Sequence, residues 1–122
     1  MWVQVPSPLP FQIGKKVRLK KNKKIVCADG FAMSVQADEG AYCSPRNDRG
    51  PYEEAEIGFP TEKEDLIMPY VEDHSCPTET VYAYVPKNVI TMVIAKHGGI
   101  VSGELPEGMP FLRAFMTFPR NT

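Results

Sequence analysis

The stretch "TVYAYVPKNVITMVIAKHGGI" occupies residues 80–100 and contains a predicted strand and the one long predicted helix of the chain. Residues 80–85 are the most β-prone run in the sequence, because they are rich in β-branched and aromatic side chains. Proline suits the first helical position, so Pro86 is expected to open a helix over residues 86–97. Apolar residues then recur at helical spacing and form one stripe: Val89, Ile90, Val93 and Ile94.

The residues after this stripe indicate where the helix ends. Lys96 and His97 are expected near the negative end of the helix dipole, where cations are favoured. Gly98 follows and is expected to supply the left-handed cap. Twelve prolines are many for 122 residues and indicate short elements joined by fixed turns.

Upstream of this stretch, alternating apolar and polar residues predict a meander of three strands, roughly at 15–20, 24–28 and 31–37. Asn22 is expected at the tip of the polar turn "KKNKK" between the first two strands. Asp29-Gly30 is a strong two-residue turn signal between the second and third.

A fourth strand is predicted in "YEEAEIGF", residues 52–59, where acids alternate with apolar residues. Its buried side would carry Ala55, Ile57 and Phe59. Its solvated side carries Glu54 and Glu56, which could also be read as paired carboxylates.

A short helix of at most two turns should follow that strand. Thr61 as N-cap and Glu64 three residues later fit a capping box, and Pro69 would end the helix. The tail "FLRAFMTF", residues 111–118, is expected to form a last strand or a strand-like arm.

These elements predict an α+β fold: a mainly antiparallel, twisted sheet of about five strands with the helix 86–97 packed on one face. Residues 1–14 would form an extended N-terminal arm, and residues 15–122 a single domain. The helix stripe is expected to meet a set of core residues in the strands: Phe31, Met33, Val35, Ile57 and either Tyr82 or Tyr84.

Composition excludes several classes of protein. The net charge of -1 gives no strong overall field, and three cysteines at irregular spacing do not form a disulfide framework. No apolar run approaches the roughly 20 residues needed to span a bilayer. A soluble, cytoplasmic protein without a cofactor is therefore expected.

The strongest local charge feature is basic. Seven cationic residues fall within ten positions: Lys15, Lys16, Arg18, Lys20, Lys21, Lys23 and Lys24. A lysine-rich hairpin of this kind could follow a phosphate backbone, which makes nucleic-acid binding one hypothesis. Lysines at a sheet edge are equally typical of protection against aggregation.

The loop "YCSPRNDRGPYE", residues 42–53, carries the residue types that favour contacts with proteins. The predicted contact residues are Tyr42, Arg46, Arg49 and Tyr52. Cys43 in the same loop could be a nucleophile activated by these arginines. The simpler interpretation is a buried, small apolar residue.

A metal site is a further hypothesis. It would use His74 and Cys76, together with Cys43 and either Asp73 or Asp29. The His-x-Cys spacing is not a standard zinc pattern, and there is no Cys-x-x-Cys pair.

Three stretches, "DGFAMSVQADEGAYCSPR", "GPYEEAEIGFP" and "TVYAYVPKNVITMVIAKHGGIV", resemble a group of small uncharacterised proteins of tailed bacteriophages and prophages. The similarity covers roughly residues 25–101. It implies a phage-related context, and thus the cytoplasm of a host bacterium. It assigns no catalytic residues.

The first functional hypothesis is therefore a non-enzymatic accessory protein that binds another protein. Nucleic-acid binding through the segment 15–24 is the alternative, and a small metal-assisted hydrolase is the second alternative. Self-association of the chain stays open.

Overall fold

A computed structural model of the protein describes residues 21–114. Five strands form one sheet in the order β4-β3-β2-β1-β5, and every neighbouring pair of strands is antiparallel. The strands are β1 (Ile25–Cys27), β2 (Ala32–Gln36), β3 (Glu54–Gly58), β4 (Val81–Pro86) and β5 (Ile100–Ser102). A 3-10 helix, η1 (Asp65–Tyr70), and an α-helix, α1 (Lys87–Lys96), complete the elements.

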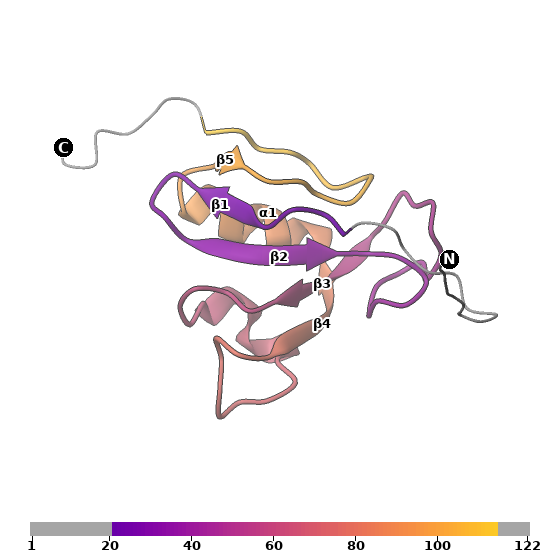
Figure 1. Ribbon diagram of the computed structural model, residues 1–122, viewed down its shortest axis with the longest axis horizontal. Helices are drawn as coiled ribbons and strands as arrows, with labels where there is room; N and C mark the ends of the chain where they lie inside the picture. Colours follow the sequence, from indigo (N-terminus) through magenta and orange to yellow (C-terminus); the bar gives the residue numbers. More distant parts are fainter. Residues whose placement is uncertain (1–20, 115–122) are drawn as a thin grey trace, which may run out of the picture.

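Figure 1 shows α1 behind the sheet, so that one face of the sheet is covered and the other is open. The structure thus confirms the predicted α+β fold. The predicted arm 1–14 and the predicted strand 15–20 lie outside the described residues. No turn is found at residues 21–24, so the predicted turn tip at Asn22 is wrong: Asn22 instead pairs with Gln36 at the end of β2.

The hairpin of β1 and β2 forms where the sequence predicts it. Asp29 and Gly30 make the turn, and Gly30 has φ = +98°, a conformation that glycine adopts without strain. The amide of Cys27 donates to the carbonyl of Phe31 at 2.8 Å and closes the turn. The Asp29 carboxylate accepts from the amide of Phe31 at 2.9 Å.

The strand β3 has the predicted alternation, with Ala55 and Ile57 buried and Glu54 and Glu56 half-exposed. Phe59 does not continue the buried side, since the strand ends at Gly58 and Phe59 turns outward with φ = +51°. The predicted burial of Phe59 is therefore wrong.

The predicted capping box at Thr61 is also wrong. The Thr61 side chain accepts a hydrogen bond from the amide of Ala32, so it is bound to β2. The N-cap of η1 is Glu64 itself, whose carboxylate accepts from the amide of Leu66 at 3.0 Å. Helix η1 is no longer than the two turns expected, but Pro69 lies inside it and does not end it, since the helix continues to Tyr70.

The strand β4 contains a β-bulge. Its register with β3 shifts between Ala55, which pairs with Val85, and Ile57, which pairs with Tyr82. Two residues of β4 therefore oppose one residue of β3. Because of the extra residue, Tyr82 and Val85 both point into the core although they are three positions apart, and Tyr84 points to solvent.

The chain passes from β4 into α1 without a loop. Pro86 is the last residue of β4 and also the N-cap of α1. The predicted helix 86–97 is thus confirmed with one residue fewer at each end. Gly98 ends it with φ = +92°, as expected for a left-handed cap.

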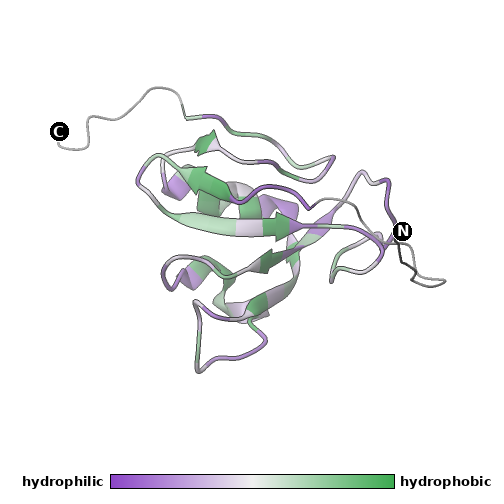
Figure 2. Cartoon of the chain, in the orientation of Figure 1, coloured by the Kyte–Doolittle hydropathy of each residue, from purple (hydrophilic) through white to green (hydrophobic). Residues whose placement is uncertain are grey.

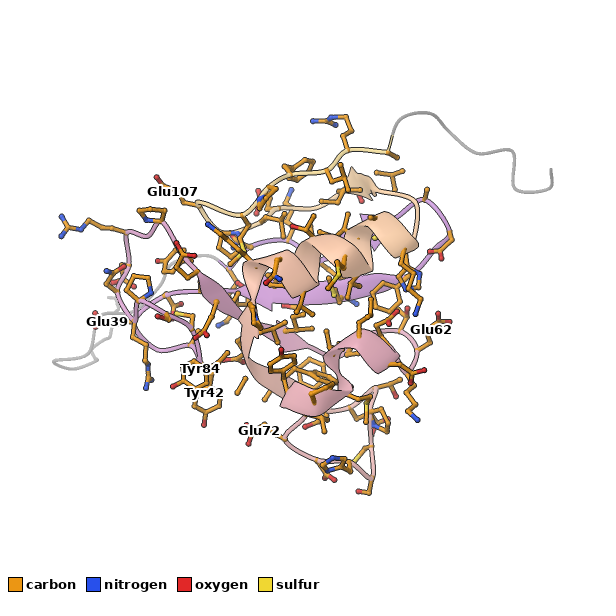
Figure 3. All side chains as sticks on the ribbon, turned by 180° about the vertical axis from the view of Figure 1, so that it is seen from behind. Glu39, Tyr42, Glu62, Glu72, Tyr84 and Glu107 are labelled. Carbon is orange, nitrogen blue, oxygen red and sulfur yellow. The ribbon has the colours of Figure 1, made fainter. Side chains whose placement is uncertain are left out.

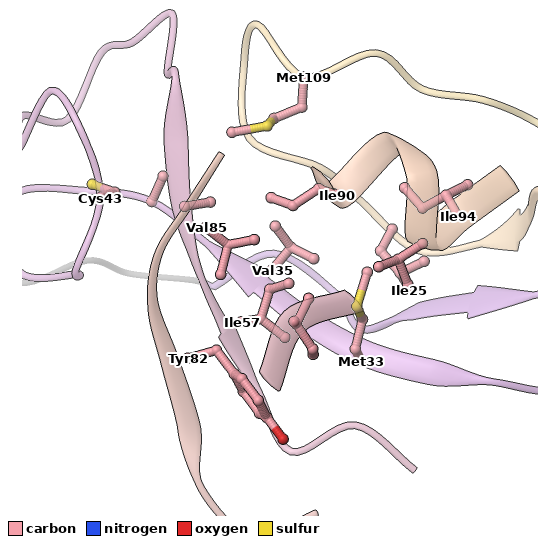
Figure 4. Close-up of a cluster of buried hydrophobic side chains, with 14 of the residues drawn as sticks. Ile25, Met33, Val35, Cys43, Ile57, Tyr82, Val85, Ile90, Ile94 and Met109 are labelled. Atoms are coloured by element: carbon pink, nitrogen blue, oxygen red, sulfur yellow. The ribbon is translucent and has the colours of Figure 1, made fainter. Parts of the chain in front are cut away.

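The core lies between the sheet and α1 (Figure 4). Ile90, Val93 and Ile94 of α1 are buried in it, and Val89 packs partly buried against it. The remaining predicted core residues are present, with Tyr82 and not Tyr84 as the buried tyrosine: Phe31, Met33, Val35, Ile57 and Tyr82. Figure 2 shows that apolar residues concentrate in the strands and α1, whereas many connecting residues are hydrophilic.

The strand β5 was not predicted. It pairs with β1 and occupies one edge of the sheet. The chain that follows comes to lie beside it, where Ile100 and Arg113 form an isolated parallel bridge. Of the predicted tail strand 111–118, this single bridge is what residues 111–114 show, and the remainder lies outside the described residues. No helix within residues 21–114 is long and apolar enough to cross a membrane.

Candidate protein-contact surface

Two tyrosines lie side by side on the surface at the bulge of β4. The ring centroids of Tyr42 and Tyr84 are 5.9 Å apart, and the rings are tilted by 41°. Both side chains are exposed, at 42% and 39%. Figure 3 shows the pair at one side of the molecule, with Glu39 and Glu72 on either side of it.

The backbone holds this pair in place. The carbonyl of Tyr42 accepts from the amide of Tyr84 at 3.1 Å, and the amide of Tyr42 donates to Oε1 of Glu56 at 2.9 Å. The residues on either side of Tyr42, Ala41 and Cys43, are both buried. The Tyr42 ring is therefore the one part of this tripeptide that faces solvent.

Tyr84 sits in a left-handed conformation, with φ = +55°. This conformation is uncommon for any residue except glycine and is a real outlier for a bulky one. It follows from the bulge, which places the extra residue of β4 at this position.

Arg46 completes this group. Its guanidinium carbon lies 6.0 Å from the centroid of the Tyr42 ring, within the range of a cation–π contact. Tyr42, Arg46, Glu56 and Tyr84 are called the tyrosine surface below. Two of the four predicted contact residues, Tyr42 and Arg46, thus belong to it.

The other two predicted contact residues lie elsewhere. Tyr52 is 4% exposed, and its hydroxyl donates to the carbonyl of Asn47 at 2.7 Å. Its side chain supports the loop from within, so assigning it to the contact surface was wrong. Arg49 is exposed near the loop tip, where its amide donates to the Asn47 side chain.

Cys43 is placed as a structural residue. It is 1% exposed, and its thiol donates to the carbonyl of Asp38 at 3.1 Å. Burial raises the pKa of the Cys43 thiol, and this outweighs the lowering influence of the nearby Arg46 charge. The simpler interpretation of Cys43 is confirmed, and the nucleophile hypothesis loses its activated thiolate.

The metal hypothesis finds no support in the described part of the chain. Cys76 contacts Asp73 at 3.3 Å in an exposed loop that also carries His74. Within residues 21–114, however, no three His, Cys, Asp or Glu side chains are arranged to hold a metal ion. The three cysteines are all free.

Of the basic segment, only Lys21, Lys23 and Lys24 are described, and all three are exposed. The backbone of Lys23 exchanges hydrogen bonds with Glu104, which fixes this segment beside the chain that follows β5.

A second polar cluster lies at the C-terminal end of α1, under the surface. His97 is 5% exposed and stacks on Phe31, with ring centroids 4.1 Å apart. Its Nδ1 lies 2.6 Å from Oδ2 of Asp29, and its Nε2 lies 2.6 Å from Oε1 of Glu64. Lys96 donates to the second Glu64 oxygen at 2.8 Å.

Both ring nitrogens of His97 face carboxylate oxygens, so the ring is assigned as a doubly protonated imidazolium. Burial by itself would lower the pKa of His97, but the hydrogen bonds to Glu64 and Asp29 outweigh it and raise the pKa above 6.5. Burial would raise the pKa of Glu64, but hydrogen bonds from Lys96, the Leu66 amide and His97 lower it below 4.5. Asp29, Glu64, Lys96 and His97 are called the charge cluster below. Their opposite charges join the β1–β2 turn, η1 and α1.

The charge cluster is poorly suited to acid–base catalysis, because both His97 nitrogens are already occupied. Local sequence patterns predict that His97 lies near the negative end of the helix dipole and that Glu64 completes a capping box. These patterns do not connect either residue with Asp29. The local sequence signal for this cluster was that each of Asp29, Glu64 and His97 is an ionisable residue next to a predicted turn or helix cap.

Comparisons of the chain with protein families, curated proteins and solved structures find no match. The functional argument therefore rests on the residues themselves.

Proposed function

We propose that this protein is a non-enzymatic accessory protein that binds another protein through the tyrosine surface. The observation that carries the proposal is the exposed pair of Tyr42 and Tyr84, held by backbone hydrogen bonds on a bulged edge strand.

The conformation of Tyr84 supports a functional role. A left-handed backbone costs a bulky residue about 1–2 kcal/mol. Strained residues of this kind concentrate at sites of function. Tyr84 is 39% exposed, so the burial of its ring offsets only part of this conformational cost. Packing alone is therefore a weak reason for a tyrosine at this position.

The chemistry of the surface also fits protein binding. Tyrosine and arginine are enriched among the residues that dominate binding energy at interfaces. The main chain of Tyr42 makes two hydrogen bonds, one with the Tyr84 amide and one with the Glu56 carboxylate, and Tyr84 lies in a strand. Little conformational entropy is then lost when a partner binds.

The phage-related context remains part of the proposal and rests on the resemblance alone. In that context the partner is a phage or host protein in an infected or lysogenic bacterium.

The test is a quantitative capture experiment with the full chain as bait in lysates of bacteria with and without an infecting tailed phage. Proteins retained by the native chain should be lost with the double variant Tyr42→Ala/Tyr84→Asn. The control is Met92→Ala, which removes a 47% exposed side chain from α1. Equal capture by the double variant and the native chain would refute the proposed surface.

A further inference from the structure

We infer that the tyrosine surface recognises a basic segment of its protein partner, with Lys or Arg side chains of the partner lying on the two exposed rings. The inference rests on the proposed function and adds the chemistry of the partner.

The rings themselves favour a cation. The face of an aromatic ring carries negative charge density and attracts ammonium and guanidinium groups. Arg46 already lies 6.0 Å from the centroid of the Tyr42 ring, so a guanidinium fits at this position of the surface. The Tyr84 ring beside it has no described cation over its face.

The surrounding charge favours the same partner. Residues 38–56, which include the loop and β3, contain six acids and two arginines, a net charge of 2 − 6 = −4. Glu56 lies against the Tyr42 amide, and the exposed Glu39 and Glu72 flank the pair (Figure 3). Clustered like charges raise the local concentration and the association rate of an oppositely charged partner.

Some of this charge is neutralised within the molecule. Glu53 forms an exposed ion pair with Lys87 at 3.3 Å, and Arg46 and Arg49 lie in the same loop. No cation of the described residues pairs with Glu39, Glu56 or Glu72 within salt-bridge distance. These three carboxylates can therefore meet a partner's cations.

The competing interpretation uses the arginines. Arg46 and Arg49 could bind acidic groups of a partner. The two interpretations make opposite predictions for Arg46→Ala. Removal of Arg46 strengthens binding of a basic partner, because a like charge leaves the surface. The same change weakens binding of an acidic partner.

The experiment is an NMR titration of the isotope-labelled full chain with two short peptides of equal length. Both have a Gly/Ser background, with arginines in one peptide and glutamates at the same positions in the other. The arginine peptide should shift the amide signals of Tyr42 and Tyr84 in a saturable way, and added salt should weaken the binding. The glutamate peptide should leave these signals in place.

Variants locate the binding. Tyr42→Ala/Tyr84→Asn should raise the dissociation constant for the arginine peptide about five- to thirtyfold, as expected for the loss of two cation–π contacts. Arg46→Ala should lower it. Met92→Ala is the control and should leave it unchanged.

Three outcomes would overturn the inference: shifts at the tyrosines with the glutamate peptide only, no shifts with either peptide, or arginine-peptide binding that the double variant does not weaken. The first of these leaves the proposed function intact with an acidic partner. The proposed function fails separately, if the capture of partners does not depend on the tyrosines.

Discussion

Nε2 of His97 lies 2.6 Å from Oε1 of Glu64, although 33 positions separate the two residues in the chain. Both side chains are almost completely buried, at 5% and 2% exposure. The contact joins the end of α1 to the start of η1, and Asp29 extends it to the β1–β2 turn. The buried positive charge of His97 is therefore balanced by carboxylates from two other elements, Glu64 and Asp29.

The first prediction concerns Glu64→Ala. The change leaves His97 and Lys96 without their shared carboxylate, and removal of one member of a buried ion pair typically costs about 3–5 kcal/mol of unfolding free energy. Asp65→Ala is the matched control. Its carboxylate is 87% exposed and pairs with Lys63 at 3.9 Å, so this substitution should cost less than about 1 kcal/mol. Urea unfolding of both variants measures the difference, and equal costs would contradict the assigned role of Glu64.

The second prediction is a pH profile of stability. The pKa of His97 is raised above 6.5 in the folded protein, so its contribution is complete below pH 6.5 and is lost as the pH rises through the folded value. The pKa of Glu64 is lowered below 4.5, so its contribution is complete above pH 4.5 and is lost as the pH falls through the folded value.

The contributions of these two groups should therefore be greatest together between pH 4.5 and 6.5. Unfolding free energies measured across this range and on both sides of it test the prediction. His97→Gln should remove most of the decline on the alkaline side. If His97→Gln still loses unfolding free energy as the pH rises, other titrating groups cause that loss.

The third prediction concerns Gly99, which has φ = +90° and lies against the tail. A Cβ atom at this position would lie 2.7 Å from Cα of Ala114. Gly30→Ala is the control, because Gly30 has φ = +98° and open space around it. The control should cost about 1–2 kcal/mol through its backbone conformation alone.

Gly99→Ala should cost more than this control, because the backbone at Ala114 has to move. Hydrogen exchange at the Ala114 amide, which donates to the carbonyl of Ile100 at 2.8 Å, should accelerate in Gly99→Ala only. Equal exchange rates in both variants would show that the tail does not depend on this close approach.

The fourth prediction separates stability from binding at Tyr84. Asparagine tolerates the left-handed conformation better than tyrosine does. Tyr84→Asn should therefore leave the unfolding free energy unchanged or raise it by up to about 1 kcal/mol. Tyr82→Ala should instead cost about 3–5 kcal/mol, because Tyr82 is fully buried. Chemical denaturation measures both, and a clear loss of stability in Tyr84→Asn would make the ring a structural residue.

The sequence predicted those features that depend on neighbouring residues. The helix stripe around Ile90 and the turn at Asp29-Gly30 are set by local periodicity and turn chemistry, and both are present. The strand β5 was missed because Ile100–Ser102 is short, and its partner, β1, is distant in the chain.

The site was predicted only in part, for the same reason. On a regular strand Tyr82 and Tyr84 would face the same side. Only pairing with β3 reveals the bulge that separates them. Tyr52 was assigned to the surface because loop composition does not show which loop residue turns inward, and Asp29 and His97 meet only in the folded chain.

The pairing of β1 with β5 has a consequence for synthesis on the ribosome. Cys27 lies opposite Ile100, so the first described strand obtains its second neighbour only after the last described strand has been made. The contact between Asp29 and His97 likewise forms only after His97, 68 positions later, has been synthesised. Contacts between such distant positions slow folding. A nascent chain that stops before residue 100 would present β1 as an unpaired edge, and the sheet is completed only when nearly all of the described chain has left the ribosome.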